Sequence, residues 1–200
     1  IGGEHNLWTR LLALWLLELR AEFSSAELVA EALGTPRLIE SLLDASLDLI
    51  IVHEEPVRPG IESIHLMDDE LVLVTTDPEG KYADRFVDIR WPGDDAADSA
   101  QLPEKVEART RITLGYASIN YLIISQGAGY LPRRLVDPYL QAGLLYPAES
   151  APVHSSSVFA AWRTGDSREM ITRATAILRD LCAAAEKGEL PPPFWRQLGQ

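Results

Sequence analysis

The alternation of helical and extended hydrophobic patterns is the feature that most restricts the fold of this chain. Leucine and tryptophan repeat at helical spacing over residues 7–23, and the β-branched run at 47–52 is typical of a strand buried on both faces. Between them Gly34-Thr35-Pro36 interrupts the chain, and we expect Thr35 to cap a helix that has Pro36 at its first position. This order predicts an α/β architecture with mainly parallel strands.

The remaining elements follow from the same periodicities. We expect an acidic loop at Asp68-Asp69 between two separate extended segments, and a capping box at Asp166-Ser167-Arg168-Glu169 that opens the last long helix. The other extended segments are expected at 27–33, 61–65, 70–76, 111–115, 127–132, 144–146 and 153–163, and the other helices at 117–126 and 133–141.

The two halves of the chain share the order strand, helix, strand. This pattern predicts two small α/β lobes joined by two crossings, one near Thr75-Thr76 and one at about 154–158. Lobes of this kind bind ligands in the cleft between them, at helix N-termini and at the carboxyl ends of strands.

Charge and composition narrow the classes of function. The chain carries 18 Lys and Arg against 30 Asp and Glu, a net charge of −12, which disfavours direct binding to nucleic acid or anionic lipid. No apolar run approaches the roughly 20 residues that span a bilayer. The single cysteine, Cys182, cannot form an internal disulfide, and no secretory leader is visible, so we expect a cytoplasmic protein. The start at Ile1, without Met, suggests an excised fragment.

Three segments, in this order and spacing, resemble the effector-binding domain of the LysR-type transcriptional regulators. LLDASLDLII at 42–51 is similar to the family's helix that runs into a Leu-Asp-Leu strand, and ELVLVT at 70–75 is similar to the strand before the first crossing. The most specific segment is GAGYLPRRLV at 127–136, followed by LQAGLL at 140–145. It matches the family pattern G-x-G-x-x-P-x-x-L-V followed by L-x-x-G-x-L.

The resemblance covers essentially the whole chain and implies two Rossmann-like lobes of the type II periplasmic-binding-protein kind. Lobe one would comprise residues 1–75 plus 156–200, and lobe two residues 76–155. The resemblance also implies an N-terminal winged helix-turn-helix that is absent from this chain, and DNA binding only through that domain. It further implies an antiparallel homodimer of these domains and a tetramer of the full-length regulator.

The resemblance also suggests where a small effector, most often a carboxylate in this family, would bind between the lobes. An anion prefers helix N-termini together with hydroxyl or amide donors. The matching positions here are His5 and Asn6 in the loop before the first helix, Thr35 before the second, Ser118 at the start of the lobe-two helix, and Thr75 at the first crossing. Helix capping alone is the competing interpretation for Thr35 and Ser118.

Two departures from the family pattern stand out. Family members often carry Ser or Thr in the loop where His5 and Asn6 stand. The segment Arg90-Trp91-Pro92-Gly93 resembles a subgroup with a Trp-Gly pair, and Pro92 interrupts that pair.

The sequence contains little that would indicate an enzyme. Cys182 lies among apolar residues of the last helix, and the histidines lack metalloprotease spacing. His53-Glu54-Glu55 with Asp68-Asp69-Glu70 could form a metal cluster, but a solvated acidic rim is the preferred interpretation. We therefore expect no enzyme, no cofactor and no metal. The remaining alternative is a free-standing solute-binding receptor of the same fold.

Overall fold

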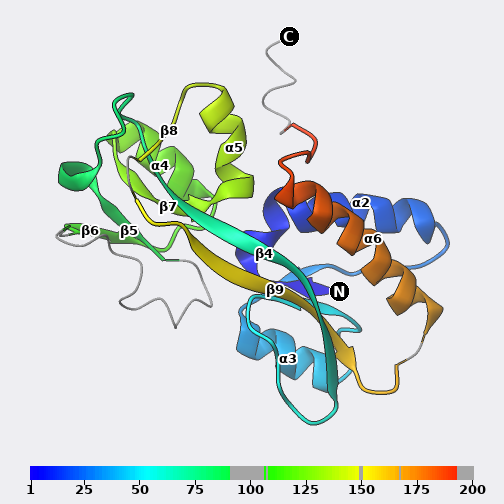
Figure 1. Ribbon diagram of the computed structural model, residues 1–200. Coiled ribbons are helices and arrows are strands. Elements are labelled where there is room, and N and C mark those ends of the chain that lie inside the picture. The colour runs from blue at the N-terminus through cyan, green and yellow to red at the C-terminus, as the bar shows by residue number, and fades with distance from the viewer. Residues whose placement is uncertain (91–105, 107, 149–150, 167, 193–200) are drawn as a thin grey trace. The chain divides into compact units, whose positions relative to one another are not determined.

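The computed structural model describes residues 1–90, 106, 108–148, 151–166 and 168–192. The chain divides into two compact units (Figure 1). Unit 1 contains Ile1–Asp68 and Ser157–Leu190, and unit 2 contains Asp69–Ser156 and Pro191–Gln200, of which Pro191 and Pro192 are described. The contacts therefore group residues 69–75 with unit 2, whereas the sequence predicts the first boundary after residue 75. The predicted departure from the family pattern at Pro92 lies outside the described residues, which stop at Arg90 in this segment.

Unit 1 is built on a mixed sheet. Strand β1 (Gly2–Gly3) pairs in parallel with β2 (Glu31–Ala32) and with β3 (Ile50–Val52), and β3 pairs antiparallel with β9 (His154–Arg163), which neighbours β4 (Ile61–Thr75). The predicted parallel pairing is therefore found around β1, and the antiparallel pairing of β3 with β9 makes the sheet mixed. The expected strand at 27–33 shrinks to the two residues of β2, both exposed, because little of that segment is buried.

The helices of unit 1 bury one continuous apolar cluster. Helices α1 (His5–Leu7), α2 (Ala13–Glu22) and α6 (Glu169–Glu186) meet there, and α2 and α6 lie side by side in Figure 1. The cluster includes the fully buried Leu11, Trp15 and Leu178. Helix α3 (Thr35–Leu43) packs Leu38 and Leu42 into a second cluster, against β1 and β3.

The sequence predicts one continuous first helix over 7–23, but the structure interrupts it. A kink within Trp8–Leu12 (η1) separates α1 from α2: Thr9 has an extended ψ of 120°, and Arg10 has a left-handed φ of 69°. Apolar residues recur at helical spacing on both sides of Thr9 and Arg10, so a spacing argument cannot detect the interruption.

The predicted acidic loop at Asp68-Asp69 is wrong, because strand β4 runs through it. Its fifteen residues are continuous, and Asp68 and Asp69 lie inside the strand. Asp68 accepts hydrogen bonds from His65 (3.0 Å) and from the Ser157 hydroxyl (2.8 Å). Asp69 pairs with a buried arginine in unit 2. Each carboxylate thus has a partner distant in sequence, which a local pattern does not reveal.

Two predicted helix caps are also wrong. Helix α3 begins at Thr35 itself, with Gly34 at the N-cap, and the Thr35 hydroxyl makes no capping hydrogen bond. Helix α6 begins at Glu169 with Arg168 at the N-cap. The carboxylate of Asp166 accepts from the Arg168 guanidinium at 2.7 Å and from the Arg168 backbone N–H at 3.4 Å, just before the helix, and Ser167 lies outside the described residues.

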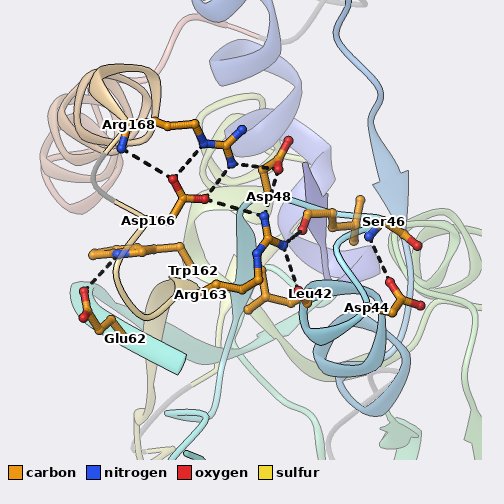
Figure 2. A network of polar contacts seen from close by, with 10 residues as sticks. Leu42, Asp44, Ser46, Asp48, Glu62, Trp162, Arg163, Asp166 and Arg168 are labelled. Atoms are coloured by element: carbon orange, nitrogen blue, oxygen red, sulfur yellow. Dashed lines mark hydrogen bonds and ion pairs between the residues drawn. The ribbon is translucent and has the colours of Figure 1, made fainter. Parts of the chain in front are cut away.

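An arginine network joins the end of β9 to α3 and α6 (Figure 2). Arg163 donates to the carbonyl oxygens of Leu42 (2.8 Å) and Leu47 (2.6 Å), and so satisfies carbonyl groups at the C-terminus of α3. The guanidinium groups of Arg163 and Arg168 both contact the carboxylates of Asp48 and Asp166. Hydrogen bonds to Asp166 and Asp48 raise the pKa of Arg168, so it stays charged.

Unit 2 confirms the elements expected around the family signature. Strand β7 (Ala128–Pro132), helix α4 (Ala117–Ser125) and helix α5 (Arg133–Gln141) all form. Residues 71–75 of β4 pair antiparallel with β7, and β8 (Tyr146–Pro147) pairs with β4. The short strands β5 (Val87–Ile89) and β6 (Thr110–Ile112) form a parallel pair after the 3-10 turn η2 (Ala83–Arg85).

A buried ion pair fixes α5 to β4 within unit 2. The Arg134 Nε donates to both oxygens of Asp69 at 3.1 Å, and its Nη2 donates to Oδ2 at 2.9 Å. The side chains are only 2% and 4% exposed. The neighbouring pair, Arg133 with Glu70, joins the same two elements but is about half exposed.

Candidate functional site

A buried carboxylate marks the carboxyl end of β1 in unit 1. Glu4 follows β1 directly, and its backbone N–H donates to the Ile51 carbonyl, which extends the parallel pairing with β3. Glu4 is 3% exposed. A charge so buried requires hydrogen-bonding partners.

Three donors from two other segments surround this carboxylate. Thr35, the first residue of α3, donates its hydroxyl to Oε1 at 2.5 Å, and the backbone N–H of His53 donates to the same oxygen at 3.3 Å. The His53 Nδ1 lies 2.5 Å from Oε2. An ionised carboxylate only accepts hydrogen bonds, so Nδ1 carries the proton in this contact.

The surroundings lower the pKa of Glu4. Burial by itself raises the pKa, but the hydrogen bonds and charge of His53 and the hydrogen bond of Thr35 together outweigh it. Glu4 is therefore ionised at neutral pH, and unit 1 holds an anion at the edge where the carboxyl ends of β1 and β3 meet the N-terminus of α3.

Two predicted site residues adjoin this carboxylate. Asn6 is buried, and its Nδ2 lies 3.5 Å from the His53 Nε2, on the ring edge opposite Glu4. His5, the first residue of α1, is exposed. The structure therefore brings Asn6 and Thr35 together through Glu4 and His53, with His5 beside them in the chain.

Ser118 is the predicted site residue whose hydroxyl has no partner. It is the second residue of α4 and is fully buried, and its Oγ makes no hydrogen bond to any residue that the structure describes. Its backbone N–H donates to the Gly115 carbonyl at 3.0 Å. A buried hydroxyl without a partner is costly, and such groups call for an explanation such as a ligand.

Thr75 has a local structural role. It ends β4 in unit 2, where its hydroxyl donates to the Lys81 carbonyl at 2.7 Å and accepts from the Asp77 N–H at 3.2 Å. These two bonds close the turn after the strand. Its predicted contact with an effector remains a prediction.

Tyr130 and Tyr116 both have hydrogen-bonding partners within unit 2. Tyr130 is buried and donates its hydroxyl to the Pro152 carbonyl at 3.0 Å. The hydroxyls of Tyr116 and Tyr139 are 2.7 Å apart. Both tyrosines are thus bonded within the unit.

A separate pocket of about 630 Å³ lies in unit 2, at the other end of α4 from Ser118. None of the five predicted site residues lines it. Its lining consists of Ala83, Asp84, Arg85, Phe86, Val87, Arg109, Thr110, Tyr121, Ser125 and Gly127.

The described residues provide neither a metal-binding cluster nor a membrane-spanning helix. Over the described part of the chain, no group of three or more His, Cys, Asp or Glu side chains is arranged to hold a metal ion. His53, one member of the weighed metal cluster, contacts Glu4 instead. The described residues also form no helix with the length and hydrophobicity required to cross a bilayer.

Glu4, the central residue of the unit 1 site, was not predicted. It lies in the loop before the first helix, next to His5, but a single glutamate there carries no signal of burial. The available signal was its place directly after Gly2-Gly3, beside a strand that ends at Val52 and a helix that starts at Thr35.

Comparisons with known proteins agree with this fold. Residues 1–79 match the family model described as the LysR substrate binding domain. No curated protein matches the chain.

Solved structures match nearly the whole chain. The regulatory domain of MetR, a LysR family regulator from *N. meningitidis*, is 25% identical, with a TM-score of 0.71 over 96% of this chain and 94% of that one. The sulfate-bound regulatory domain of the OxyR2 E204G mutant from *Vibrio vulnificus* is 18% identical, with a TM-score of 0.70 over 90% and 93%. Full-length LysG from *Corynebacterium glutamicum*, with bound effector Arg, is 16% identical, with a TM-score of 0.70 over 90% and 66%.

These findings confirm the two-lobe α/β fold of the type II periplasmic-binding-protein kind. Domains of this family bind small-molecule effectors and oligomerise. The match of residues 1–79 to the family model and the likeness of nearly the whole chain to the MetR regulatory domain support the interpretation of the chain as an effector-binding domain of a LysR-type regulator.

Proposed function

We propose that this chain senses a small anionic effector, a carboxylate in the first instance, and thereby controls DNA binding by the full-length regulator. The observation that carries the proposal is the buried hydroxyl of Ser118, which has no partner among the described residues. It stands in the first turn of α4, where the helix dipole favours negative charge.

The other predicted contacts enter the proposal with different weights. His5 is exposed, so its imidazole can form a hydrogen bond with a ligand. Asn6 is held close to His53. The hydroxyls of Thr35 and Thr75 are already engaged within the chain, so we assign to these residues a contact through atoms other than the hydroxyl proton.

Regulation follows from linkage. An effector can shift the regulator between two states only by the difference between its affinities for them. We propose that the domain forms an antiparallel homodimer, that the full-length protein is a tetramer, and that DNA is bound through a separate winged helix-turn-helix. Since a regulator of this kind acts on the chromosome, we place it in the bacterial cytoplasm, with no enzymatic activity of its own.

A thermal-shift screen of this chain against small carboxylates, amino acids, aromatic acids and phosphates tests the proposal. A ligand at about 100 times its Kd stabilises the fold by about 2.7 kcal/mol, which raises the Tm by about 5–10 °C for a chain of this size. We expect Ser118→Ala to abolish or sharply reduce the shift.

The unliganded variants supply the control. Ser118→Ala removes a hydroxyl that bonds to nothing described, so its Tm without ligand should equal or exceed that of the wild type. Ser125→Ala, at the other end of α4, should keep the full ligand response. A ligand shift that survives Ser118→Ala unchanged contradicts the proposed role of this hydroxyl.

A further inference from the structure

We propose that unit 1 contains an anion-binding site for a small carboxylate, formed by Thr35 and His53, and that Glu4 occupies it as a built-in ligand. Two consequences separate this site from an ordinary buried ion pair. The donors should bind a free carboxylate when the Glu4 side chain is removed, and the intact chain should exclude one.

The donors are arranged as a site and not as a single contact. The Thr35 hydroxyl and the His53 backbone N–H converge on Oε1, and the His53 ring meets Oε2. They come from two segments, the first residue of α3 and the residue after β3. Both oxygens of one carboxylate are therefore held by groups that recognise an anion by hydrogen bonding and charge.

The carboxylate reaches these donors from a third segment. The side chain of Glu4 contacts Thr35 and His53, and its backbone N–H donates to the carbonyl of Ile51 in β3. Its side chain is 4% exposed and that of His53 is 14% exposed, so water is largely excluded from the contact. Truncation of Glu4 to alanine would leave the donors facing a small cavity of carboxylate size.

Asn6 contacts the opposite edge of the same imidazole. The His53 Nδ1 is bonded to Glu4, and the Asn6 Nδ2 lies 3.5 Å from the His53 Nε2, so both ring nitrogens have a side-chain neighbour. Asn6 therefore orients His53 toward the carboxylate, as an outer-shell residue orients a ligand.

The occupied site restricts where an effector's acid group can bind. Because Glu4 already fills these donors, a second carboxylate there would meet a buried like charge. This consequence rests on the proposed function: the carboxylate of the effector must bind away from Thr35, and the group that faces Glu4 must be a hydrogen-bond donor or a cation.

Chemical rescue of Glu4→Ala by acetate or formate tests the site. We expect 100 mM sodium acetate to raise the Tm of Glu4→Ala by about 3–5 °C more than sodium chloride at the same ionic strength, in a saturable manner. Wild type and the closed isostere Glu4→Gln should respond to the two salts equally. Acetamide, which has the same shape without the charge, should rescue Glu4→Ala less than acetate.

Two further variants keep the test decisive. Thr35→Val in the Glu4→Ala background should weaken acetate binding at least about tenfold, because a charge-assisted hydrogen bond is lost. Glu22→Ala removes an exposed carboxylate that binds Arg173, and it should show no acetate-specific rescue.

Each outcome bears on the site. If Glu4→Ala responds to acetate as it does to chloride, or stays unfolded in acetate, the site does not exist. If rescue occurs but survives Thr35→Val, the ion binds elsewhere. Neither result depends on Ser118, so failure here and failure of the proposed effector site can be told apart.

Discussion

The buried ion pair between Asp69 and Arg134 allows a quantitative test against a matched neighbour. Two adjacent pairs join β4 to α5: Asp69 with Arg134, which is 2–4% exposed, and Glu70 with Arg133, which is 45–48% exposed. The two pairs share sequence context and elements. They differ in burial and in the number of hydrogen bonds, of which the buried pair has three.

Removing Arg134 leaves the carboxylate of Asp69 buried without its cation. Loss of one partner of a buried pair costs about 3–5 kcal/mol, whereas an exposed pair contributes about 0–1 kcal/mol. We therefore expect Arg134→Met to lower the free energy of unfolding by about 3–5 kcal/mol. With an m value of about 2 kcal/mol/M, the urea midpoint falls by about 1.5–2.5 M.

Urea titration followed by circular dichroism measures the difference. The control Arg133→Met should move the midpoint by about 0.5 M or less. The double variant Asp69→Leu with Arg134→Met should recover much of the loss, because two apolar side chains leave no buried charge. Equal effects of Arg134→Met and Arg133→Met would refute the reasoning, since burial would then have no influence on the value of the pair.

Three further outcomes are expected. In the folded chain the pKa of Glu4 is lowered below its ordinary 4.5. The stabilisation that ionised Glu4 provides is therefore complete above about pH 4.5 and is lost as the pH falls through the pKa of the folded state. We expect the Tm advantage of wild type over Glu4→Gln to shrink between about pH 6 and pH 3. Gly129→Ala should cost about 1–3 kcal/mol in urea titration, because a Cβ there would stand 3.0 Å from the Val87 carbonyl oxygen. Gly34→Ala, with no atom within 4 Å, should cost no more than about 1 kcal/mol, because only the N-cap of α3 becomes poorer. The fully buried Cys182 thiol should react with Ellman's reagent only after unfolding; rapid reaction of the native chain would contradict its burial.

The sequence was informative about elements with strong local patterns. The segment GAGYLPRRLV and the helix after it gave β7 and α5 with their bounds nearly correct. The apolar run at 47–52 gave β3, because a strand buried on both faces leaves a continuous hydrophobic signature.

Local patterns failed where a distant partner decides the structure. Asp68-Asp69 suggested a loop, yet β4 continues through both residues because Ser157 and Arg134 satisfy their carboxylates. Thr35 suggested a cap, but its hydroxyl binds Glu4, 31 residues earlier. Such pairings are long-range side-chain contacts, and no periodicity encodes them.

The candidate site was predictable in type but not in detail. The expectation of donors at the N-terminus of α3 located Thr35, but not the anion that it binds. The expectation at α4 located Ser118, whose buried hydroxyl only the packed structure reveals.

The discontinuity of unit 1 has a consequence for synthesis. Residues 69–156 of unit 2 leave the ribosome in one stretch, whereas the core of unit 1 needs β9 and α6 from 157–190. At about 5–20 residues per second, the apolar face of α2 waits several seconds for the helix that covers it. The nascent chain thus completes the long continuous segment of unit 2 before the core of unit 1, and during that interval the leucine-rich N-terminal segment is the part most exposed to aggregation and to chaperones.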